Sequence, residues 1–427
     1  MSKSLFQAPR GTRDILPEEA GKWRSVLDAF ADLAEGYGYG QVISPIFEDV
    51  GVFQRLGENT EIVSKEMFIF HDKDLKSPQE LALRPELTAS ICRAYAQHRP
   101  VTPWKVWYSG PQFRYEKPQA GRFRQFVQVG AEVIGEEDPA TDVEVISLAW
   151  RFYESIGLKD VALLLNTLGD PATRTAFNHE LKSYLSSRIN ELSPQSQITM
   201  EKNPLRVLDS KRENDLEVLG DAPTIEEFLN QADKEHFDSV RDGLNSLNIP
   251  FEITPRLVRG LDYYTRTTFE FISTGLQTAQ NAIGGGGRYD GLIEEMGGPP
   301  TQGIGFALGV DRILLACEAE KLEIEGTKPL EVFVVDMTGG SHATQIADEL
   351  RKSGFGVDRS FGGRSMKAQM KVADRSGALY AIIVGDDELE KNEVTLRDLR
   401  GDGSQVRVSR SSIEKALNET IEGRNPQ

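Results

Sequence analysis

Residues 104–135 constrain the fold of this chain most strongly, because two strand-like runs there flank a polar loop. In the second run, apolar residues occupy every other position over residues 127–133, with Gln128 and Glu132 between them. Side chains alternate between the two faces of a strand, so one face packs on a core and the other presents an amide and a carboxylate. The segment therefore predicts an antiparallel hairpin in a sheet-based domain.

The polar face of this hairpin also carries candidate binding residues. Arg114 and Glu116 share a face of the first run, and Arg122 and Arg124 lie in the loop. One interpretation is a platform for a small molecule with a clamp for its phosphates. The alternative is a polar-faced hairpin with ordinary solvent-exposed charges, and the hairpin alone does not decide between them.

Two further segments combine strand-forming residues with unusual glycines or charges. Residues 257–271 (LVRGLDYYTRTTFEF) crowd Arg259, Tyr263 and Tyr264 among strand formers. Residues 284–292 begin with four glycines, which are costly in conformational entropy. The glycines indicate either a close approach of the backbone to a ligand or chain, or a flexible hairpin loop.

A third glycine-containing segment, residues 303–314 (GIGFALGVDRIL), reads as a strand followed by a helix. Gly303 and Gly305 would leave one strand face bare, so that a flat ring could lie on it while Arg312 stacks from the helix. The spacing is not that of a dinucleotide-binding fingerprint, and the phosphate-binding pattern GxxxxGK[ST] is absent from the sequence.

Composition excludes several classes of protein. The two cysteines form no CxxC pair, the five histidines show no metal-binding spacing, and no GxSxG nucleophile motif is present. No apolar stretch is long enough for a membrane span and no secretory signal is evident, so we expect a cytoplasmic protein. The net charge is −17, yet residues 351–375 contain seven basic and two acidic residues. An acidic body with a basic stretch remains compatible with a polyanionic partner.

The 427 residues are expected to form two or three domains. Residues 39–47 read as one strand, and Pro45 within it predicts a sheet edge or an interface. Helix signals predominate from about 170 to 250, where a capping box at Thr224 predicts the start of a long helix. We interpret this part as a helical insertion. After a polar linker, residues 330–427 alternate strands and helices, which is typical of a small α/β domain.

Taken together and in order, these segments resemble the histidyl-tRNA synthetases, a family of class II aminoacyl-tRNA synthetases. RGTRDILP and the strand with Pro45 resemble the opening of the family and its dimer-forming motif 1. GPQFRYEKPQAGRFRQFVQVGAEVIG resembles motif 2, and GIGFALGVDR resembles motif 3. RGLDYYTRTTFEF and GGGGRYDGL resemble two signatures that are peculiar to the histidine-specific enzymes.

The resemblance implies an α+β catalytic domain at residues 1–325, with an antiparallel sheet flanked by helices and the helical insertion at about 170–250. It implies a C-terminal α/β anticodon-binding domain at 330–427, a homodimer and no membrane partner. The implied reaction activates L-histidine with ATP to histidyl-adenylate and then transfers histidine to the 3′-terminal ribose of tRNA(His). Mg²⁺ would accompany ATP rather than bind a metal motif of the protein.

The resemblance also implies roles in binding histidine. In LRPELTAS, Glu86 and Thr88 match residues that hold the α-amino group, with help from Gln128. Glu132 and Tyr264 match the pair that reads the imidazole. Leu87 and Tyr263 are adjacent to these residues, and we include them among the predicted histidine contacts.

The remaining implied roles concern ATP and catalysis. Arg114 matches the motif 2 arginine at the α-phosphate, and Arg122 matches a contact to the terminal phosphate. Arg312 matches the motif 3 arginine near the adenine and γ-phosphate, and Glu116 is included among the ATP contacts. Arg259 matches the special arginine of the family at the reacting phosphate, so Arg259 and Arg114 are the predicted catalytic residues.

Two alternatives remain open. A paralogue that resembles these synthetases serves as a regulatory subunit of ATP phosphoribosyltransferase in histidine biosynthesis. That paralogue typically lacks the anticodon-binding domain, which the C-terminal pattern here predicts. A bare nucleic-acid-binding scaffold is the other alternative, but it would not explain polar segments that fit one substrate.

Overall fold

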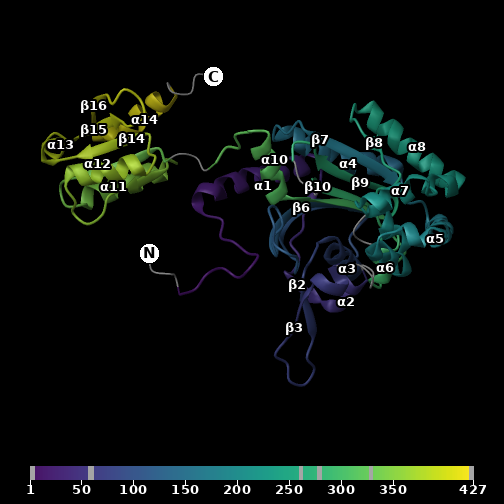
Figure 1. Cartoon of the computed structure of the whole chain (residues 1–427). Coiled ribbons are helices and arrows are strands. Elements are labelled where there is room, and N and C mark those ends of the chain that lie inside the picture. Colours follow the sequence, from purple (N-terminus) through teal and green to yellow (C-terminus); the bar gives the residue numbers. More distant parts are fainter. Residues whose placement is uncertain (1–4, 56–61, 259–262, 277–280, 327–329, 423–427) are drawn as a thin grey trace. The chain divides into compact units, whose positions relative to one another are not determined.

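The computed structural model describes residues 5–55, 62–258, 263–276, 281–326 and 330–422. The chain divides into two compact units, Met1–Gly326 and Thr327–Gln427. Figure 1 shows the first from purple to green and the second in yellow-green and yellow. No helix within the described ranges is both long and apolar enough to cross a membrane.

An eight-stranded sheet in the order β1-β5-β6-β11-β10-β9-β7-β8 organises the first unit. The interior pairs are antiparallel, and only the short edge strands β1 and β8 pair in parallel. The strands are β1 (Gly40–Gln41), β5 (Trp104–Phe113), β6 (Gln125–Ile134), β7 (Val161–Thr167), β8 (Glu252–Ile253), β9 (Thr265–Ser273), β10 (Ala282–Arg288) and β11 (Gly303–Gly309).

The predicted hairpin is confirmed as β5 and β6, which pair along their whole length from Trp104 opposite Ile134 to Phe113 opposite Gln125. Val129, Ala131 and Val133 pack in the main core, as their alternation predicts. Two helices that contribute to this core are α1 (Pro17–Gly36) and α4 (Pro139–Ser155). The opposite face of β6 is thereby left for the candidate site.

The prediction of a single strand over residues 39–47 is wrong. The chain forms β1 and then β2 (Phe47–Asp49), which belong to different sheets, and Pro45 lies between them. Proline has no N–H to donate, so the ladder cannot continue through it. Both strands are edge strands, as Pro45 predicts, and β2 borders a three-stranded sheet with β4 (Glu80–Leu83) and β3 (Phe68–His71).

The glycine run is not a flexible loop, because residues 284–287 lie inside β10 between β9 and β11. A methyl group on Gly286 would lie 2.0 Å from the carbonyl oxygen of Gly305. A methyl group on Gly287 would lie 2.6 Å from the carbonyl oxygen of Thr267. Glycine is therefore required here because neighbouring strands approach too closely for a Cβ atom.

The helical insertion has a core of its own, in which Phe177, Leu181 and Leu185 are buried. Its capping box at Thr224 opens a short 3₁₀ helix, Ile225–Phe228, rather than the predicted long helix, because the backbone extends again at Leu229. The long helix is capped instead by Asn230. The α-helices are α5 (Pro171–Ser187), α6 (Pro194–Lys202), α7 (Glu213–Gly220) and α8 (Gln231–Ser246).

The second unit has a five-stranded sheet in the order β13-β12-β14-β15-β16. The first three strands are parallel and the last two antiparallel, so the predicted α/β fold is confirmed. The short helix α13 (Asp386–Glu390) is not predicted from the sequence. The other elements are β12 (Val332–Asp336), α11 (Ser341–Lys352), β13 (Val357–Arg359), α12 (Met366–Arg375), β14 (Tyr380–Val384), β15 (Glu393–Asp398), β16 (Gln405–Ser409) and α14 (Ile413–Glu422).

Candidate active site

A cavity of about 280 Å³ lies on the polar face of the large sheet. Its walls come from the β5–β6 hairpin, from the start of α3 (Thr88–His98), from β9 to β11 and from α10 (Val310–Ala319). The predicted site residues that line it are Glu86, Thr88, Arg114, Glu116, Arg122, Gln128, Tyr263, Tyr264 and Arg312. Segments far apart in the sequence therefore meet in one pocket.

One end of the cavity is rich in hydrogen-bond acceptors. Glu86 accepts hydrogen bonds from the backbone N–H groups of Thr88 at 2.9 Å and Ala89 at 2.7 Å, at the N-terminus of α3. Burial raises the pKa of Glu86, and these amides act in the opposite direction. The Oε1 atom of Gln128 is buried and has no hydrogen-bond partner among the described residues. A carboxylate and a free amide oxygen fit a positively charged donor such as an ammonium group.

Glu132 is fully buried and does not line the cavity itself. Its carboxylate accepts hydrogen bonds from Thr88 Oγ1 at 2.7 Å, Tyr289 OH at 2.8 Å and Tyr108 OH at 3.3 Å. Burial raises the pKa of Glu132 to about 8 against the effect of these hydroxyls. Because Thr88 lines the cavity, its hydroxyl links Glu132 to the cavity wall.

The strand face that the sequence predicts to be bare is partly filled by the chain itself. A methyl group on Gly303 would lie 2.1 Å from the ring of Tyr289, and one on Gly305 would lie 1.6 Å from Glu132 Oε2. The open part of β11 lies further along, where Ala307 and Gly309 line the cavity. The surface of β11 that is open to the cavity is therefore this end and not Gly303.

Two adjacent tyrosines form another wall. The ring centroids of Tyr263 and Tyr264 are 4.6 Å apart, and Tyr289 lies edge-on to Tyr263 at 6.0 Å. Burial raises the pKa of Tyr263 well above its usual value, with Tyr264 as the next cause. Its phenol therefore stays protonated at neutral pH.

Three arginines approach the cavity from the hairpin and α10. Arg114 donates from Nε to the Pro85 carbonyl at 2.9 Å, Arg122 pairs with Glu116 at 3.0 Å, and Arg312 donates to the Ala282 carbonyl at 2.5 Å. Burial, followed by the positive charge of Arg122, lowers the pKa of Arg312. Such a cluster of guanidinium groups is suited to a polyphosphate.

Besides Glu132, two predicted residues are not among those that line the cavity. Leu87 is buried in a second core with Val50 and Phe53, and its side chain does not line the cavity. Arg259 lies outside the described residues.

The cavity also has lining residues that sequence reasoning missed, among them Phe126, Glu270 and Asp311. Phe126 lies two positions before Gln128 on the same face of β6, so the alternation could have identified it. Its ring lies 5.2 Å from the guanidinium of Arg114. Glu270 alternates in the same way with the buried Phe269 and Phe271. Asp311 adjoins Arg312 in the sequence, but its ion pair with Arg13 at 3.4 Å has no sequence signal.

Comparison with known proteins identifies the family. The family model described as Histidyl-tRNA synthetase matches residues 11–313. The chain belongs to the histidyl-tRNA synthetase family. A second model, described as Anticodon binding domain, matches residues 331–420. The predicted resemblance and the two-part fold class are thus confirmed.

Known histidine–tRNA ligases are similar to this chain over nearly its whole length. The ligase of Geobacillus kaustophilus is 45% identical over 97% of this chain and 99% of its own. The ligase of Listeria innocua is 44% identical over 98% and 99%. The crystal structure of apo S. aureus histidyl-tRNA synthetase matches with a TM-score of 0.81 and 36% identity, covering 97% of this chain and 100% of that one.

Proposed function

We propose that this chain is a histidine–tRNA ligase that forms histidyl-adenylate from L-histidine and ATP and then transfers histidine to the 3′-terminal ribose of tRNA(His). The observation that carries the proposal is one cavity that combines the acceptors Glu86 and Gln128 with three arginines. The acceptors suit the α-amino group of an amino acid, and the arginines suit the phosphates of ATP.

In the proposed first step, the carboxylate of histidine attacks the α-phosphate of ATP and displaces pyrophosphate. A carboxylate is already an anion at neutral pH, so the step needs no general base. Arg114 would hold the α-phosphate, Arg122 the terminal phosphate, and Arg312 the γ-phosphate and the adenine. Catalysis then consists of positioning and charge stabilisation, with Arg259 as the further predicted arginine.

Magnesium fits the cavity together with the nucleotide. Mg²⁺ is usually held by one or two carboxylates plus substrate phosphates, and Glu116 and Glu270 both line the cavity. The described residues contain no group of three potential metal ligands that would form a separate metal site. When bound, Mg²⁺ would neutralise phosphate charge.

Selectivity for histidine is proposed to come from Glu132 and Tyr264. The imidazole ring has two nitrogens that need partners, and a carboxylate and a phenol can satisfy both. An amino acid without these nitrogens would not make the hydrogen bonds for which the site is built, and such sites can reject the analogue roughly 10⁴–10⁵-fold. Such discrimination makes a separate editing domain unnecessary.

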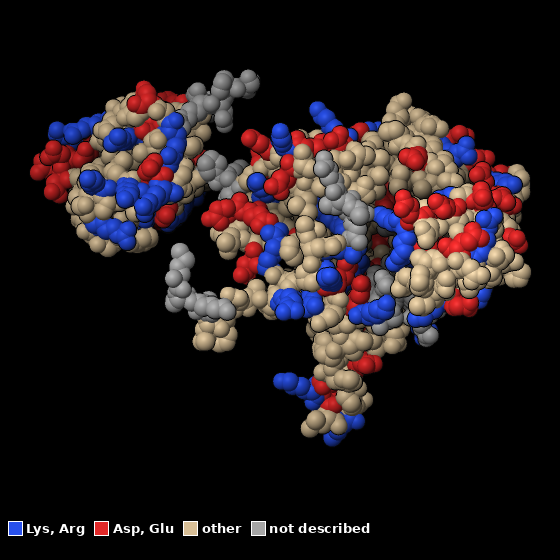
Figure 2. All heavy atoms as spheres, in the orientation of Figure 1, with Lys and Arg blue, Asp and Glu red and all other residues tan. Residues whose placement is uncertain are grey.

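For the transfer step, we propose that the second unit binds the anticodon and the insertion holds the acceptor arm. Phe361 is 65% exposed and lies 4.8 Å from the guanidinium of Arg359, which suits stacking of an unpaired base. Lys and Arg side chains gather on the second unit in Figure 2. The basic stretch over residues 351–375 belongs to this unit.

The proposed homodimer is supported by an apolar surface around the three-stranded sheet. Phe47 and Phe70 are both exposed with ring centroids 6.0 Å apart, and Ile43, Ile46 and Ile69 are exposed nearby in sequence. An apolar surface of this kind is typical of an interface. A second copy of the chain would cover it.

The alternative function as a regulatory subunit of ATP phosphoribosyltransferase has less support. The Geobacillus kaustophilus and Listeria innocua relatives, which match over nearly the whole chain, are named histidine–tRNA ligase, and the C-terminal unit matches an anticodon-binding model. The three arginines proposed to bind ATP, Arg114, Arg122 and Arg312, also line one cavity.

Histidine-dependent exchange between ATP and pyrophosphate, measured without tRNA, tests the proposal. We expect exchange with histidine and none with the other standard amino acids. Histidine binding without exchange would favour the regulatory alternative and contradict the proposed ligase.

A further inference from the structure

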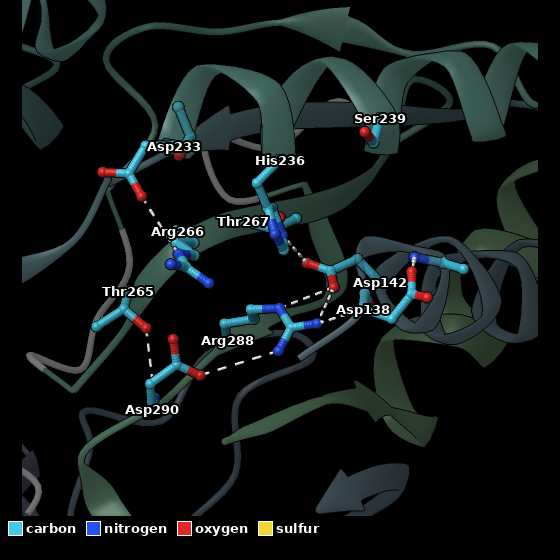
Figure 3. A network of polar contacts seen from close by, with 12 residues as sticks. Asp138, Asp142, Asp233, His236, Ser239, Thr265, Arg266, Thr267, Arg288 and Asp290 are labelled. Carbon is cyan, nitrogen blue, oxygen red and sulfur yellow. Dashed lines mark hydrogen bonds and ion pairs between the residues drawn. The ribbon is translucent and has the colours of Figure 1, made fainter. Parts of the chain in front are cut away.

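A buried polar joint connects the helical insertion to β9, where Figure 3 shows Asp233 bound to Arg266. Its centre is Asp233, in the first turn of α8, which is 1% exposed. One carboxylate oxygen of Asp233 accepts the Asp170 backbone N–H at 2.8 Å and the Thr173 hydroxyl at 3.3 Å. The other carboxylate oxygen accepts a hydrogen bond from Nε of Arg266 at 3.2 Å. One carboxylate thus joins α8 to the N-terminus of α5 and to β9.

The N-terminal caps of α5 and α8 also bind each other. Asp170 caps α5 by accepting the Thr173 N–H at 2.7 Å, and Asn230 caps α8 by accepting the Asp233 N–H at 2.8 Å. The side-chain amide of Asn230 then donates to Asp170 at 3.0 Å. A shift of the two helices relative to one another at this end would break the hydrogen bond between their capping residues.

The joint holds the backbone next to Tyr264. Arg266 has a positive φ of 44°, an unfavourable conformation for a residue other than glycine. Its N–H donates to the Gly169 carbonyl at 2.8 Å, and its carbonyl accepts the Leu168 N–H at 2.7 Å. From the first turn of α5, Arg174 donates to the carbonyl of Tyr264 at 2.8 Å. Residues of the insertion therefore bind the chain on both sides of Thr265, at Tyr264 and at Arg266. The side chain of Tyr264 lines the cavity.

A second branch of the network leads towards Glu132, which is buried behind Thr88. Arg288 is completely buried and binds Asp142, to which His236 of α8 also binds at 3.2 Å. The next residue, Tyr289, donates its hydroxyl hydrogen bond to Glu132 at 2.8 Å. The insertion is thus connected to both side chains that the proposed function assigns to the imidazole.

We propose that Arg174 and Asp233 are positioning residues for histidine selection, acting through the backbone at Tyr264–Arg266. Neither residue lines the cavity. Their contacts fix the part of the chain that carries Tyr264, so histidine affinity depends on how the insertion is held. The inference rests on the proposed function, since it takes Tyr264 as an imidazole contact.

The test compares Arg174→Met and Asp233→Asn with wild type in histidine-dependent pyrophosphate exchange by the full chain. Each variant should raise the KM for histidine about tenfold, as expected for a lost charge-assisted hydrogen bond. The KM for ATP should stay unchanged, because the three arginines belong to the β5–β6 hairpin and to α10. Matched controls are the exposed Lys182→Met in α5 and Asp238→Asn in α8, which should leave both constants unchanged.

A purely structural role would lower the melting temperature and the yield of active enzyme without changing the KM for histidine, and that result would overturn the inference. Arg174→Lys keeps a donor and should fall between wild type and Arg174→Met. In a Tyr264→Phe background, Arg174→Met should raise the KM by much less than in wild type. If Arg174→Met raised the KM for histidine by the same factor in both backgrounds, that result would also overturn the inference. Absence of exchange in wild type would instead overturn the proposed function, and this inference with it.

Discussion

The carboxylate of Glu132 occupies the space that a side chain at Gly305 would need. A methyl group on Gly305 would lie 1.6 Å from Glu132 Oε2 and 2.6 Å from the carbonyl oxygen of Ala131. Because three hydroxyl groups hold this carboxylate, it cannot move aside without losing hydrogen bonds. The glycine of motif 3 and the carboxylate of motif 2 therefore depend on each other.

Gly305→Ala should reduce the free energy of unfolding by about 1–3 kcal/mol, the usual cost of overpacking, and should raise the KM for histidine. Thermal melting and pyrophosphate exchange measure the two effects. The control is Gly291→Ala, since no atom lies within 4 Å of a methyl group there. Equal behaviour of the two variants would contradict the dependence of Glu132 on Gly305.

Glu132→Gln should make stability less dependent on pH. Burial raises the pKa of Glu132 from 4.5 to about 8, so the folded protein favours the neutral carboxyl group. Its contribution is fully present below pH 4.5 and is lost as the pH rises through about 8. The melting temperature of the variant minus that of wild type should therefore be larger at pH 9 than at pH 6. Glu213→Gln, on the exposed face of α7, should show no such trend.

Arg122→Met should raise the KM for ATP by about 10- to 100-fold, because it removes a charged partner of the phosphates. The KM for histidine should change little, since the acceptors Glu86 and Gln128 are untouched. Pyrophosphate exchange at varied ATP and histidine provides both constants. Arg24→Met, whose side chain is 83% exposed on α1, is the matched control. An unchanged KM for ATP would exclude Arg122 from the phosphate site.

Phe361→Ala should raise the KM for tRNA(His) about tenfold or more, given that stacking contributes about 1–3 kcal/mol per base. Exchange without tRNA should be unchanged. Val406→Ala, an exposed apolar residue of the same unit, should have no effect on charging, and Phe361→Trp should retain function. If the alanine and control variants charge tRNA equally, no base stacks on Phe361.

Phe70→Asp should convert the proposed homodimer to monomers, because it places a charge in the apolar surface beside Phe47. Sedimentation velocity measures the oligomeric state, and circular dichroism checks that the variant is folded. Leu75→Asp, at a side chain that is 99% exposed, should stay dimeric. A dimeric Phe70→Asp variant would place the interface elsewhere.

Local sequence patterns predict much of this structure because they reflect the alternation of side chains along a strand and the chemistry of the backbone. The alternation around Gln128 and Glu132 assigns each face of β6. The same reasoning predicts one strand through Pro45 and misplaces the helix start at Thr224. Both errors arise where tertiary packing selects between neighbouring local options.

Other features depend on contacts between distant residues, which a single sequence does not reveal. The flexible-loop alternative for residues 284–287 fails because their neighbours in β9 and β11 are invisible in the local pattern. The ion pair of Arg288 with Asp142 spans 146 residues. Likewise, nothing near Glu132 in the sequence indicates that Tyr289 will bind it.

The close approach of β10 and β11 means that part of the pocket floor is main chain rather than side chain. A single substitution can change a side chain in the wall, such as Arg312 or Gln128, but no substitution can replace a peptide group. Larger residues at Gly286 or Gly305 would also separate the strands. In the evolution of this pocket, altered specificity would therefore arise more readily from substitutions in its walls than from changes in its floor.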